Sequence, residues 1–366
     1  MNNFYLICPI GLESALISEL ELKWDIHFGC DAAISYHIEK GGVLIECELK
    51  YGLLLNQILK TPSKILLRLK SQKCRDIPKL YNIFKKFPWK DYLNQETASI
   101  NVTAKKSRLI HTDKIKAAAL DGLNDYFSAN KIKESIKIKH QNDPKQTLYI
   151  RLSNDDLTIS LDTSGDLLHI RGDGKFRGHA PIRENFAALL LKILFKDLPK
   201  KKYNLIDPMC GSGTFLKEAK NHFSINDRDF NYQYLNKNLL QDRPIVDSVN
   251  SHWDVELYGG DIDPEIIKQL DSTSIQYNVQ DVFSTEPLNV DKLDNLVIVN
   301  PPYGKGVKIK EDKSDYFKKL IIHMEKLYRP KRLGIIIPRP FERALKGQKT
   351  YFKQNGIDVC FLVKTV

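Results

Sequence analysis

From residue 203 onward the sequence alternates between strand-like and helix-like stretches, and this alternation most constrains how the chain can fold. Five short apolar stretches have the composition of buried strands: Tyr203–Ile206, Val255–Tyr258, Ser274–Val279, Asn295–Val299 and Arg332–Ile337. Three stretches have a helical pattern: Gly213–His222, Pro264–Leu270 and Asp315–Tyr328. Because strands that alternate with helices pair in parallel, the pattern predicts a doubly wound α/β sheet.

The end of the chain breaks this rhythm. Asn355-Gly356 separates two strand-like runs, residues 349–353 and 357–363. Asn-Gly between two strands is typical of a type I′ hairpin turn. The sheet is therefore expected to be mostly parallel, with a terminal antiparallel hairpin.

Ahead of residue 203 the sequence predicts smaller α+β modules. A strand at Phe4–Ile7 and a helix at Leu12–Leu22 are followed by a turn at Gly41-Gly42 and another strand at Val43–Cys47. With a strand leading into that turn, this β-α-β-β pattern suits a ferredoxin-like unit. An apolar helix at Glu184–Phe195 follows a glycine-containing joint. Four regions are predicted: a ferredoxin-like region 1–60, a second α+β module 61–165, a connecting segment and helix 166–202, and the α/β domain 203–366.

The charge of the chain is unevenly distributed. The net charge is +11, but residues 1–49 carry 2 basic and 8 acidic side chains, a net of −6. Residues 50–170 carry 22 basic and 12 acidic side chains, a net of +10. Such a segment suits a phosphate-facing surface, although lysine-rich faces are often only solvated. Charge alone therefore leaves nucleic-acid binding and simple solubility both open.

The cysteines and the apolar runs exclude several classes of protein. Six cysteines are scattered over 366 residues without a C-x-x-C pair, which is typical of a reduced, cytoplasmic protein. No H-E-x-x-H motif occurs, so no metal site is expected. The longest apolar runs are far shorter than a membrane span, and the first residues lack the basic region of a signal peptide. No membrane partner is expected.

Two motifs follow the first two predicted strands of the α/β domain. In "LIDPMCGSGTF", Asp207 ends a strand, and Gly211 and Gly213 let the backbone approach a ligand closely. The motif is neither a Walker loop nor a G-x-G-x-x-G turn. In "YGGDIDPE", Asp261 ends the next strand, where a carboxylate can accept both hydroxyls of a ribose. Asp263 is expected to cap the helix after it.

Two further sites follow the third and fourth predicted strands. "NVQD" brings Asp281 to the end of a strand, where it could hold an adenine amino group. "VIVNPPYGKG" places Asn300, Pro301, Pro302 and Tyr303 directly after a buried strand. Two prolines end the strand abruptly, and a simple turn would not need this set of residues.

Together these motifs resemble class I S-adenosylmethionine-dependent methyltransferases that act on exocyclic amines, whose layout is a parallel sheet closed by an antiparallel hairpin. The resemblance implies that the first motif wraps the methionine end of the cofactor, that Asp261 binds its ribose, and that the N-P-P-Y loop holds the target nitrogen. It assigns the catalytic residues Asn300, Pro301, Pro302 and Tyr303. It assigns to the cofactor Asp207, Met209, Gly211, Gly213, Thr214, Asp261, Ile262, Asp281 and, in "GHAPIRE", Arg183.

The N-P-P-Y loop alone leaves four targets: adenine N6, cytosine N4, guanine N2 and a glutamine amide. Stretches such as "ICPIGLESALISELE", "FKKFPW" and "VTAKKSRLIHTDKI" resemble the bacterial large-subunit ribosomal RNA guanine-N2 methyltransferase family. That resemblance implies a THUMP RNA-binding domain in residues 61–165 and RNA as the partner of residues 50–170 and of the active-site face. Transfer RNA guanine-N2 methyltransferases share the architecture. A non-catalytic RNA-binding or assembly factor with this fold is the alternative of another class.

Overall fold

The computed structural model describes residues 1–29, 32–93, 97–130, 137–138, 146–171, 182–240, 245–249, 253–270, 273–283, 286–290, 292–303 and 312–366. The chain divides into two compact units. The first unit comprises residues 1–7, 24–168 and 226–246. The second unit comprises residues 8–23, 169–225 and 247–366. Helix α1 (Glu13–Phe28) contributes residues to both units.

The first unit is built on a mixed sheet with the strand order β2-β3-β1-β4-β8-β7-β5-β6. Its strands are β1 (Asn2–Ile7), β2 (Ile34–Glu39), β3 (Gly42–Cys47), β4 (Lys64–Lys73), β5 (Thr97–Lys105), β6 (Lys137–Ile138), β7 (Thr147–Ser153) and β8 (Asp156–Asp162). Its helices are α2 (Leu49–Ile58), α3 (Ile77–Lys86) and α4 (Thr112–Ala129), with short 3₁₀ turns at Trp89–Asp91, Asn231–Tyr234 and Lys237–Leu240. β5 pairs in parallel with β7, and β7 pairs antiparallel with β8.

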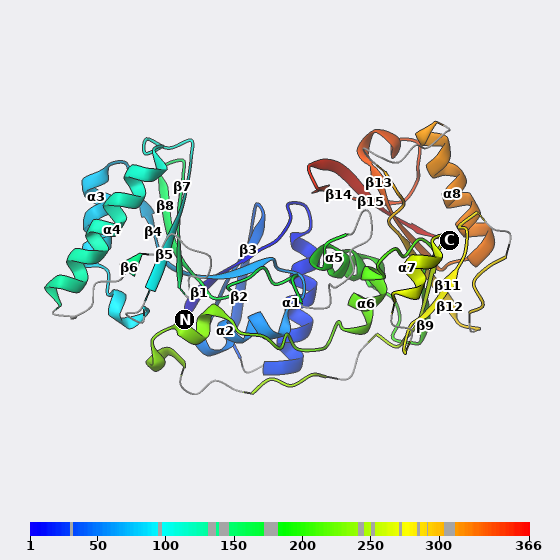
Figure 1. Cartoon of the computed structure of the whole chain (residues 1–366), viewed down its shortest axis with the longest axis horizontal. Helices are drawn as coiled ribbons and strands as arrows, with labels where there is room; N and C mark the ends of the chain where they lie inside the picture. The colour runs from blue at the N-terminus through cyan, green and yellow to red at the C-terminus, as the bar shows by residue number, and fades with distance from the viewer. Residues whose placement is uncertain are drawn as a thin grey trace. The chain divides into compact units, whose positions relative to one another are not determined.

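Helices α3 and α4 pack side by side, next to the half of the sheet that contains β5, β7 and β8 (Figure 1). The Asp76 side chain caps α3 by accepting a hydrogen bond from the Lys79 N–H at 2.7 Å. Gly122 allows the close approach of the two helices, because a Cβ at this position would lie 2.5 Å from the Tyr81 carbonyl oxygen. Local capping and one small residue therefore fix this helix pair.

The second unit is a sheet with the strand order β11-β10-β9-β12-β13-β15-β14. Its strands are β9 (Tyr203–Asp207), β10 (Val255–Asp261), β11 (Gln276–Val279), β12 (Asp294–Val299), β13 (Arg332–Pro338), β14 (Gln348–Gln354) and β15 (Ile357–Thr365). Its helices are α5 (Glu184–Phe195), α6 (Thr214–Lys220), α7 (Pro264–Lys268) and α8 (Lys313–Tyr328), with a 3₁₀ turn at Arg339–Phe341. β15 pairs antiparallel with β13 and β14, and the other pairings are parallel, which confirms the predicted α/β sheet with its terminal hairpin.

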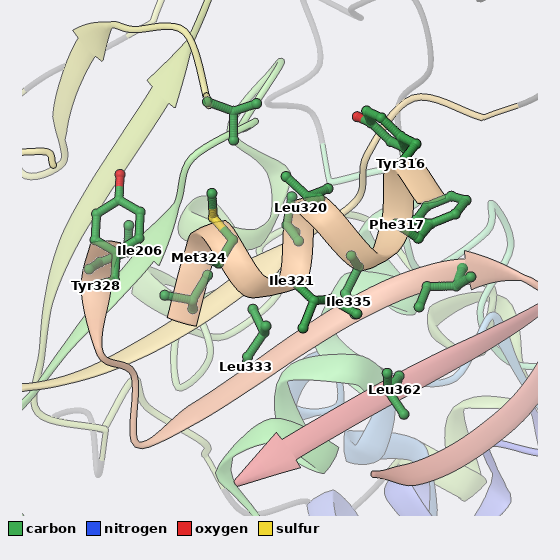
Figure 2. Close-up of a cluster of buried hydrophobic side chains, with 14 of the residues drawn as sticks. Ile206, Tyr316, Phe317, Leu320, Ile321, Met324, Tyr328, Leu333, Ile335 and Leu362 are labelled. Atoms are coloured by element: carbon green, nitrogen blue, oxygen red, sulfur yellow. The ribbon is translucent and has the colours of Figure 1, made fainter. Parts of the chain in front are cut away.

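The sheet of the second unit buries both faces, as parallel strands covered by helices do. Side chains alternate along a strand. Leu333 and Ile335 of β13 therefore belong to the cluster under α8, whereas a Cβ at Gly334 would meet Leu194 of α5. Figure 2 shows α8 placing Leu320, Ile321 and Met324 over this sheet. All seventeen residues of the cluster are at most 9% exposed: Ile206, Tyr258, Val282, Leu288, Val297, Val299, Tyr316, Phe317, Leu320, Ile321, Met324, Tyr328, Leu333, Ile335, Ile337, Cys360 and Leu362.

The predicted elements of the α/β domain all occur, with ends shifted by a few residues, and helix α5 has the predicted bounds. Each of the two units combines segments that are far apart in the sequence, whereas each predicted region is one continuous stretch. Residues 8–23 group with the second unit and residues 226–246 with the first. The boundaries predicted at 60, 165 and 202 stay predictions.

Among the helices in the described part of the chain, none is long and apolar enough to cross a membrane. The described cysteines, Cys8, Cys47, Cys74, Cys210 and Cys360, are buried and free.

Candidate active site

Three polar residues stand at the ends of three neighbouring strands in the second unit. Asp207 is the last residue of β9, Asp261 is the last of β10, and Asn300 directly follows β12. β9 pairs in parallel with both β10 and β12, so the three residues lie at one edge of the sheet. The chain passes from β9 to β10 on one side and returns to β12 on the other. This edge is therefore a topological switch point, where open α/β sheets bind ligands.

The loop after β9 is held by the neighbouring strand. The Gly211 N–H donates to Asp261 Oδ2 at 2.9 Å, and the Cys210 N–H donates to the Gly260 carbonyl oxygen at 2.8 Å. The other oxygen of Asp261, Oδ1, accepts from the Asp263 N–H at 3.0 Å. The carboxylate thus shapes the backbone of both turns, and each oxygen keeps a second acceptor site for a ligand.

The same loop needs glycine at two positions. Gly211 and Gly213 have φ angles of 50° and 73°, in the left-handed region that favours glycine. A Cβ on Gly213 would lie 2.5 Å from the hydroxyl oxygen of Tyr277, closer than real contacts permit. Gly213 precedes α6, whose first residue, Thr214, lies 3.1 Å from Ser212 between their hydroxyl oxygens. The backbone of this loop therefore forms a narrow cradle beside the sheet edge.

Asp207 is the most deeply buried of the three aspartates at the edge, Asp207, Asp261 and Asp281. Its side chain is only 2% exposed, and it accepts one hydrogen bond, from the Met209 N–H at 3.2 Å. Burial raises the pKa of Asp207 to about 8; the Met209 N–H lowers it, and the neighbouring Asp261 charge raises it. Met209 is half-buried and packs against the core cluster. A positively charged group on a ligand would stabilise the ionised form of this carboxylate.

The turn after β10 combines a helix cap with an exposed apolar side chain. Asp263 caps α7 by accepting from the Glu265 N–H at 2.9 Å, and Pro264 occupies the first turn, as predicted. Ile262 is 67% exposed between the two aspartates. An apolar side chain that stays exposed at a ligand-binding edge is suited to contact a planar ring.

The structure places Asp281 at the same edge. β11 pairs in parallel with β10 so that Val279 lies opposite Asp261, and Asp281 follows two residues later. Its Oδ1 accepts from the Phe283 N–H at 2.9 Å. Although the segment between Asp261 and Asp281 is short, Asp281 therefore still lies at this edge of the sheet. The contact of Asp281 with adenine stays a prediction.

Asn300 carries an acceptor that has no partner in the part of the chain that the structure describes. Its side-chain oxygen, Oδ1, is buried and accepts no hydrogen bond from the described residues. Leaving a buried acceptor unpaired costs about 1–3 kcal/mol. Such a group in a native fold calls for an explanation, and a ligand that donates a hydrogen bond is one. Pro301 beside it is buried, and Pro302 is half-buried.

Tyr303 is fixed at both ends of its side chain. The ring packs against the core cluster, and the hydroxyl donates to Gln354 Oε1 at 2.8 Å. Burial raises the pKa of Tyr303, so the hydroxyl stays protonated at neutral pH. Gln354 is the last residue of β14 and was not among the predicted site residues.

Arg183 is the remaining predicted cofactor residue. It is the N-cap residue of α5, its backbone is extended, and its side chain is exposed and does not cap the helix. The residues just before it, 172–181, lie outside the described part of the chain. Its contact with the cofactor stays a prediction.

Sequence reasoning missed two residues that shape this edge, Tyr277 and Gln354. Tyr277 limits the space at Gly213, and Gln354 holds Tyr303. For Tyr277 the only sequence signal was an aromatic residue within a short strand-like stretch. For Gln354 no neighbouring residue in the sequence indicates a contact with Tyr303.

The strand order, the terminal antiparallel hairpin and the glycine cradle define a class I methyltransferase fold. A family model described as "RMKL-like, methyltransferase domain" matches residues 171–353, half of the chain, and the chain belongs to this family. A THUMP domain matches residues 74–162, within the region where the sequence predicts one.

Named proteins and solved structures are similar to parts or all of the chain. A ribosomal RNA large subunit methyltransferase K/L of Cellvibrio japonicus is 29% identical over 225 residues, which are 60% of this chain and 28% of that protein. The chain thus spans less than a third of the length of this relative. TrmN from Thermus thermophilus has a similar fold, with a TM-score of 0.70 at 15% identity, and the match covers 100% of both chains. SMU.472, assigned as a methyltransferase and solved with SAH, matches with a TM-score of 0.76 at 20% identity over 100% of this chain and 98% of that one.

The family confirms the predicted cofactor, S-adenosylmethionine. The residues at the sheet edge fit this molecule chemically. The cradle at Gly213 has no room for a side chain, Asp261 offers acceptors suited to ribose hydroxyls, and buried Asp207 favours a cationic neighbour. The individual contacts of these residues with the cofactor stay predictions.

Proposed function

We propose that this protein transfers a methyl group from S-adenosylmethionine to the exocyclic N2 amine of a guanine in structured RNA, with large-subunit ribosomal RNA as the first candidate. The observation that carries the proposal is the buried side-chain oxygen of Asn300, which has no partner among the described residues and lies at the switch point of a methyltransferase sheet. In this proposal the oxygen is one of the acceptors that hold the target amine. An exocyclic amine has two hydrogens to donate to such acceptors.

The residues after β12 account for the chemistry that an aromatic amine needs. The lone pair of the guanine amine is delocalised into the ring, so the nitrogen is a poor nucleophile. The Asn300 side-chain oxygen and the Pro301 carbonyl oxygen each accept one amine hydrogen and orient the nitrogen. The bound cofactor supplies an electrophilic methyl group. No strong base is needed before transfer, in keeping with the absence of histidine from the sequence 297–306.

Tyr303 supports the base in this arrangement. Moving a base out of its stack costs a few kcal/mol. Stacking on an aromatic ring returns about 1–3 kcal/mol per base. Since the Tyr303 hydroxyl is hydrogen-bonded to Gln354, the ring is already fixed before the base arrives. The face of the ring turned away from the core cluster is the stacking surface.

The choice of RNA rests on the first unit and on the relatives. The THUMP match over residues 74–162 falls in the segment 50–170, whose net charge is +10 from 22 basic and 12 acidic side chains. A basic surface attracts phosphates whatever the sequence of the RNA. Ribosomal RNA is named in the relative from Cellvibrio japonicus. Transfer RNA remains the alternative target.

The test is incubation of the purified chain with labelled S-adenosylmethionine and separate pools of unmodified ribosomal and transfer RNA, followed by nucleoside mass spectrometry. N2-methylguanosine in the ribosomal pool supports the proposal. N2-methylguanosine found only in the transfer RNA pool would show that the target is transfer RNA and not ribosomal RNA. Methylated adenosine or cytidine overturns the guanine assignment, and RNA binding without label in either pool favours a non-catalytic RNA-binding factor.

A further inference from the structure

We propose that Gln354 is a positioning residue for methyl transfer: it fixes the ring of Tyr303 in the orientation that receives the target base. The proposal rests on the proposed function for the role of Tyr303. Its direct observation is the hydrogen bond from the Tyr303 hydroxyl to Gln354 Oε1, 2.8 Å long. The two residues are 51 positions apart in the sequence.

Gln354 is itself held rigidly. It is 7% exposed and is the last residue of β14, opposite Ile357 at the start of β15. Between them Asn355 and Gly356 have φ angles of 49° and 81°, as a type I′ turn requires. The hairpin fixes the backbone of Gln354, and burial leaves its side chain little room for other conformations, so the position of its amide oxygen is restricted.

The hairpin connects this fixed point to the strand that carries Asn300. β14 pairs with β15, β15 with β13, and β13 with β12. The segment from Asn300 to Tyr303 is therefore attached to one sheet at both ends, by β12 at Asn300 and by Gln354 at Tyr303. The stacking ring and the amide acceptor of Asn300 keep a defined separation because both are tied to the same sheet.

Loss of the hydrogen bond should affect the reaction more than the binding of RNA. Without it the Tyr303 ring keeps its apolar contacts but can take other orientations, and the base is presented to the methyl donor less often in the reactive geometry. RNA affinity comes mainly from phosphate contacts elsewhere and should stay the same. The predicted effect is a lower kcat with an unchanged KM for RNA.

The experiment compares kcat and KM for RNA in Tyr303→Phe, Gln354→Met and the double variant. Each single variant should lower kcat roughly 3- to 10-fold, as for loss of one hydrogen bond. The double variant should be no slower than either single variant, because both remove the same interaction. Gln354→Glu keeps an acceptor oxygen and should restore most of kcat. The matched control is Gln348→Met, an exposed glutamine on the same strand, with wild-type kinetics.

Two results would overturn the proposal: a wild-type kcat for Tyr303→Phe, or slowing in the double variant equal to the product of the two single effects. Thermal unfolding and cofactor affinity are measured for every variant. If Gln354→Met does not fold, Tyr303→Phe, which keeps the ring, decides alone. The rates are measured on whichever nucleoside the wild-type protein methylates, so an incorrect guanine assignment does not obscure the result for Gln354.

Discussion

The Asp261 carboxylate accepts a hydrogen bond from the Gly211 N–H at 2.9 Å and another from the Asp263 N–H at 3.0 Å. The residue predicted to bind the ribose of the cofactor therefore also holds the glycine cradle and the turn after β10. On this prediction, cofactor binding and the shape of the loop depend on the same two oxygens.

Replacing Asp261 with asparagine should lower both stability and cofactor affinity. An amide has one acceptor oxygen, so one of the two backbone N–H groups would face an NH₂ group instead. A hydrogen bond to a charged group contributes about 1.5–3 kcal/mol. Thermal unfolding without cofactor and calorimetry with it measure the two effects. Asp263→Asn is the control, because asparagine caps a helix as well as aspartate does. A reduced cofactor affinity with an unchanged unfolding temperature would show that Asp261 contacts the cofactor but does not stabilise the loop.

Gly213→Ala tests the tightness of the cradle against a matched glycine. Gly213 and Gly29 both have φ of 73°. A Cβ on Gly213 would lie 2.5 Å from the Tyr277 hydroxyl oxygen, whereas a Cβ on Gly29 would meet no atom of the described residues within 4 Å. Both variants carry the cost of a left-handed backbone, about 1–2 kcal/mol. Only Gly213→Ala should also lower cofactor affinity, by at least about tenfold, and Tyr277→Phe should recover part of the loss. Equal behaviour of the two variants in calorimetry would contradict a crowded cradle.

Asp207 should make stability depend on pH. Burial raises its pKa from 3.8 to about 8, so the folded state favours the protonated carboxyl. Its contribution to the free energy of unfolding is full below pH 4 and is lost as the pH rises to about 8. Asp207→Asn removes this dependence. The difference in unfolding temperature, variant minus wild type, should increase between pH 5 and pH 8 without cofactor. A constant difference across this range would show that Asp207 does not titrate there.

The fragment 166–366 should be unstable, although it contains the whole predicted α/β domain. It lacks residues 8–23, which belong to the second unit. In that segment Lys23, 1% exposed, pairs with Glu19 at 2.7 Å and donates to the His222 carbonyl oxygen at 2.7 Å. Domains are stable by only 5–15 kcal/mol, so losing a buried helical segment removes a large share. Circular dichroism should show no cooperative unfolding; a cooperative transition with the cofactor affinity of the full chain would refute this.

The sequence predicted the parts of the site that depend on local patterns. Asp207, Asp261 and Asn300 stand where apolar strands end, and Asn355-Gly356 marks the hairpin by its own turn chemistry. It predicted a β-α-β-β order but gave no bounds for β2 (Ile34–Glu39), because no residue in that strand is fully buried and no apolar run forms. The contact of Gln354 with Tyr303 was also missed, because it arises only when β14 joins the sheet. The sequence also did not predict that residues 8–23 group with the second unit and residues 226–246 with the first. This grouping depends on long-range packing, which leaves no local sequence pattern.

The central claim is that the buried oxygen of Asn300, which accepts no hydrogen bond within the described part of the chain, holds the amine that is methylated. The most direct measurement is single-turnover methyl transfer by Asn300→Ala, with the cofactor Kd measured by calorimetry on the same preparation. Asn289→Ala, an exposed asparagine in the same unit, is the control. The account predicts that Asn300→Ala transfers methyl at least about a hundredfold more slowly, as for loss of a transition-state hydrogen bond, with the cofactor Kd nearly unchanged. A wild-type rate, or a lost cofactor site in a folded protein, would contradict it.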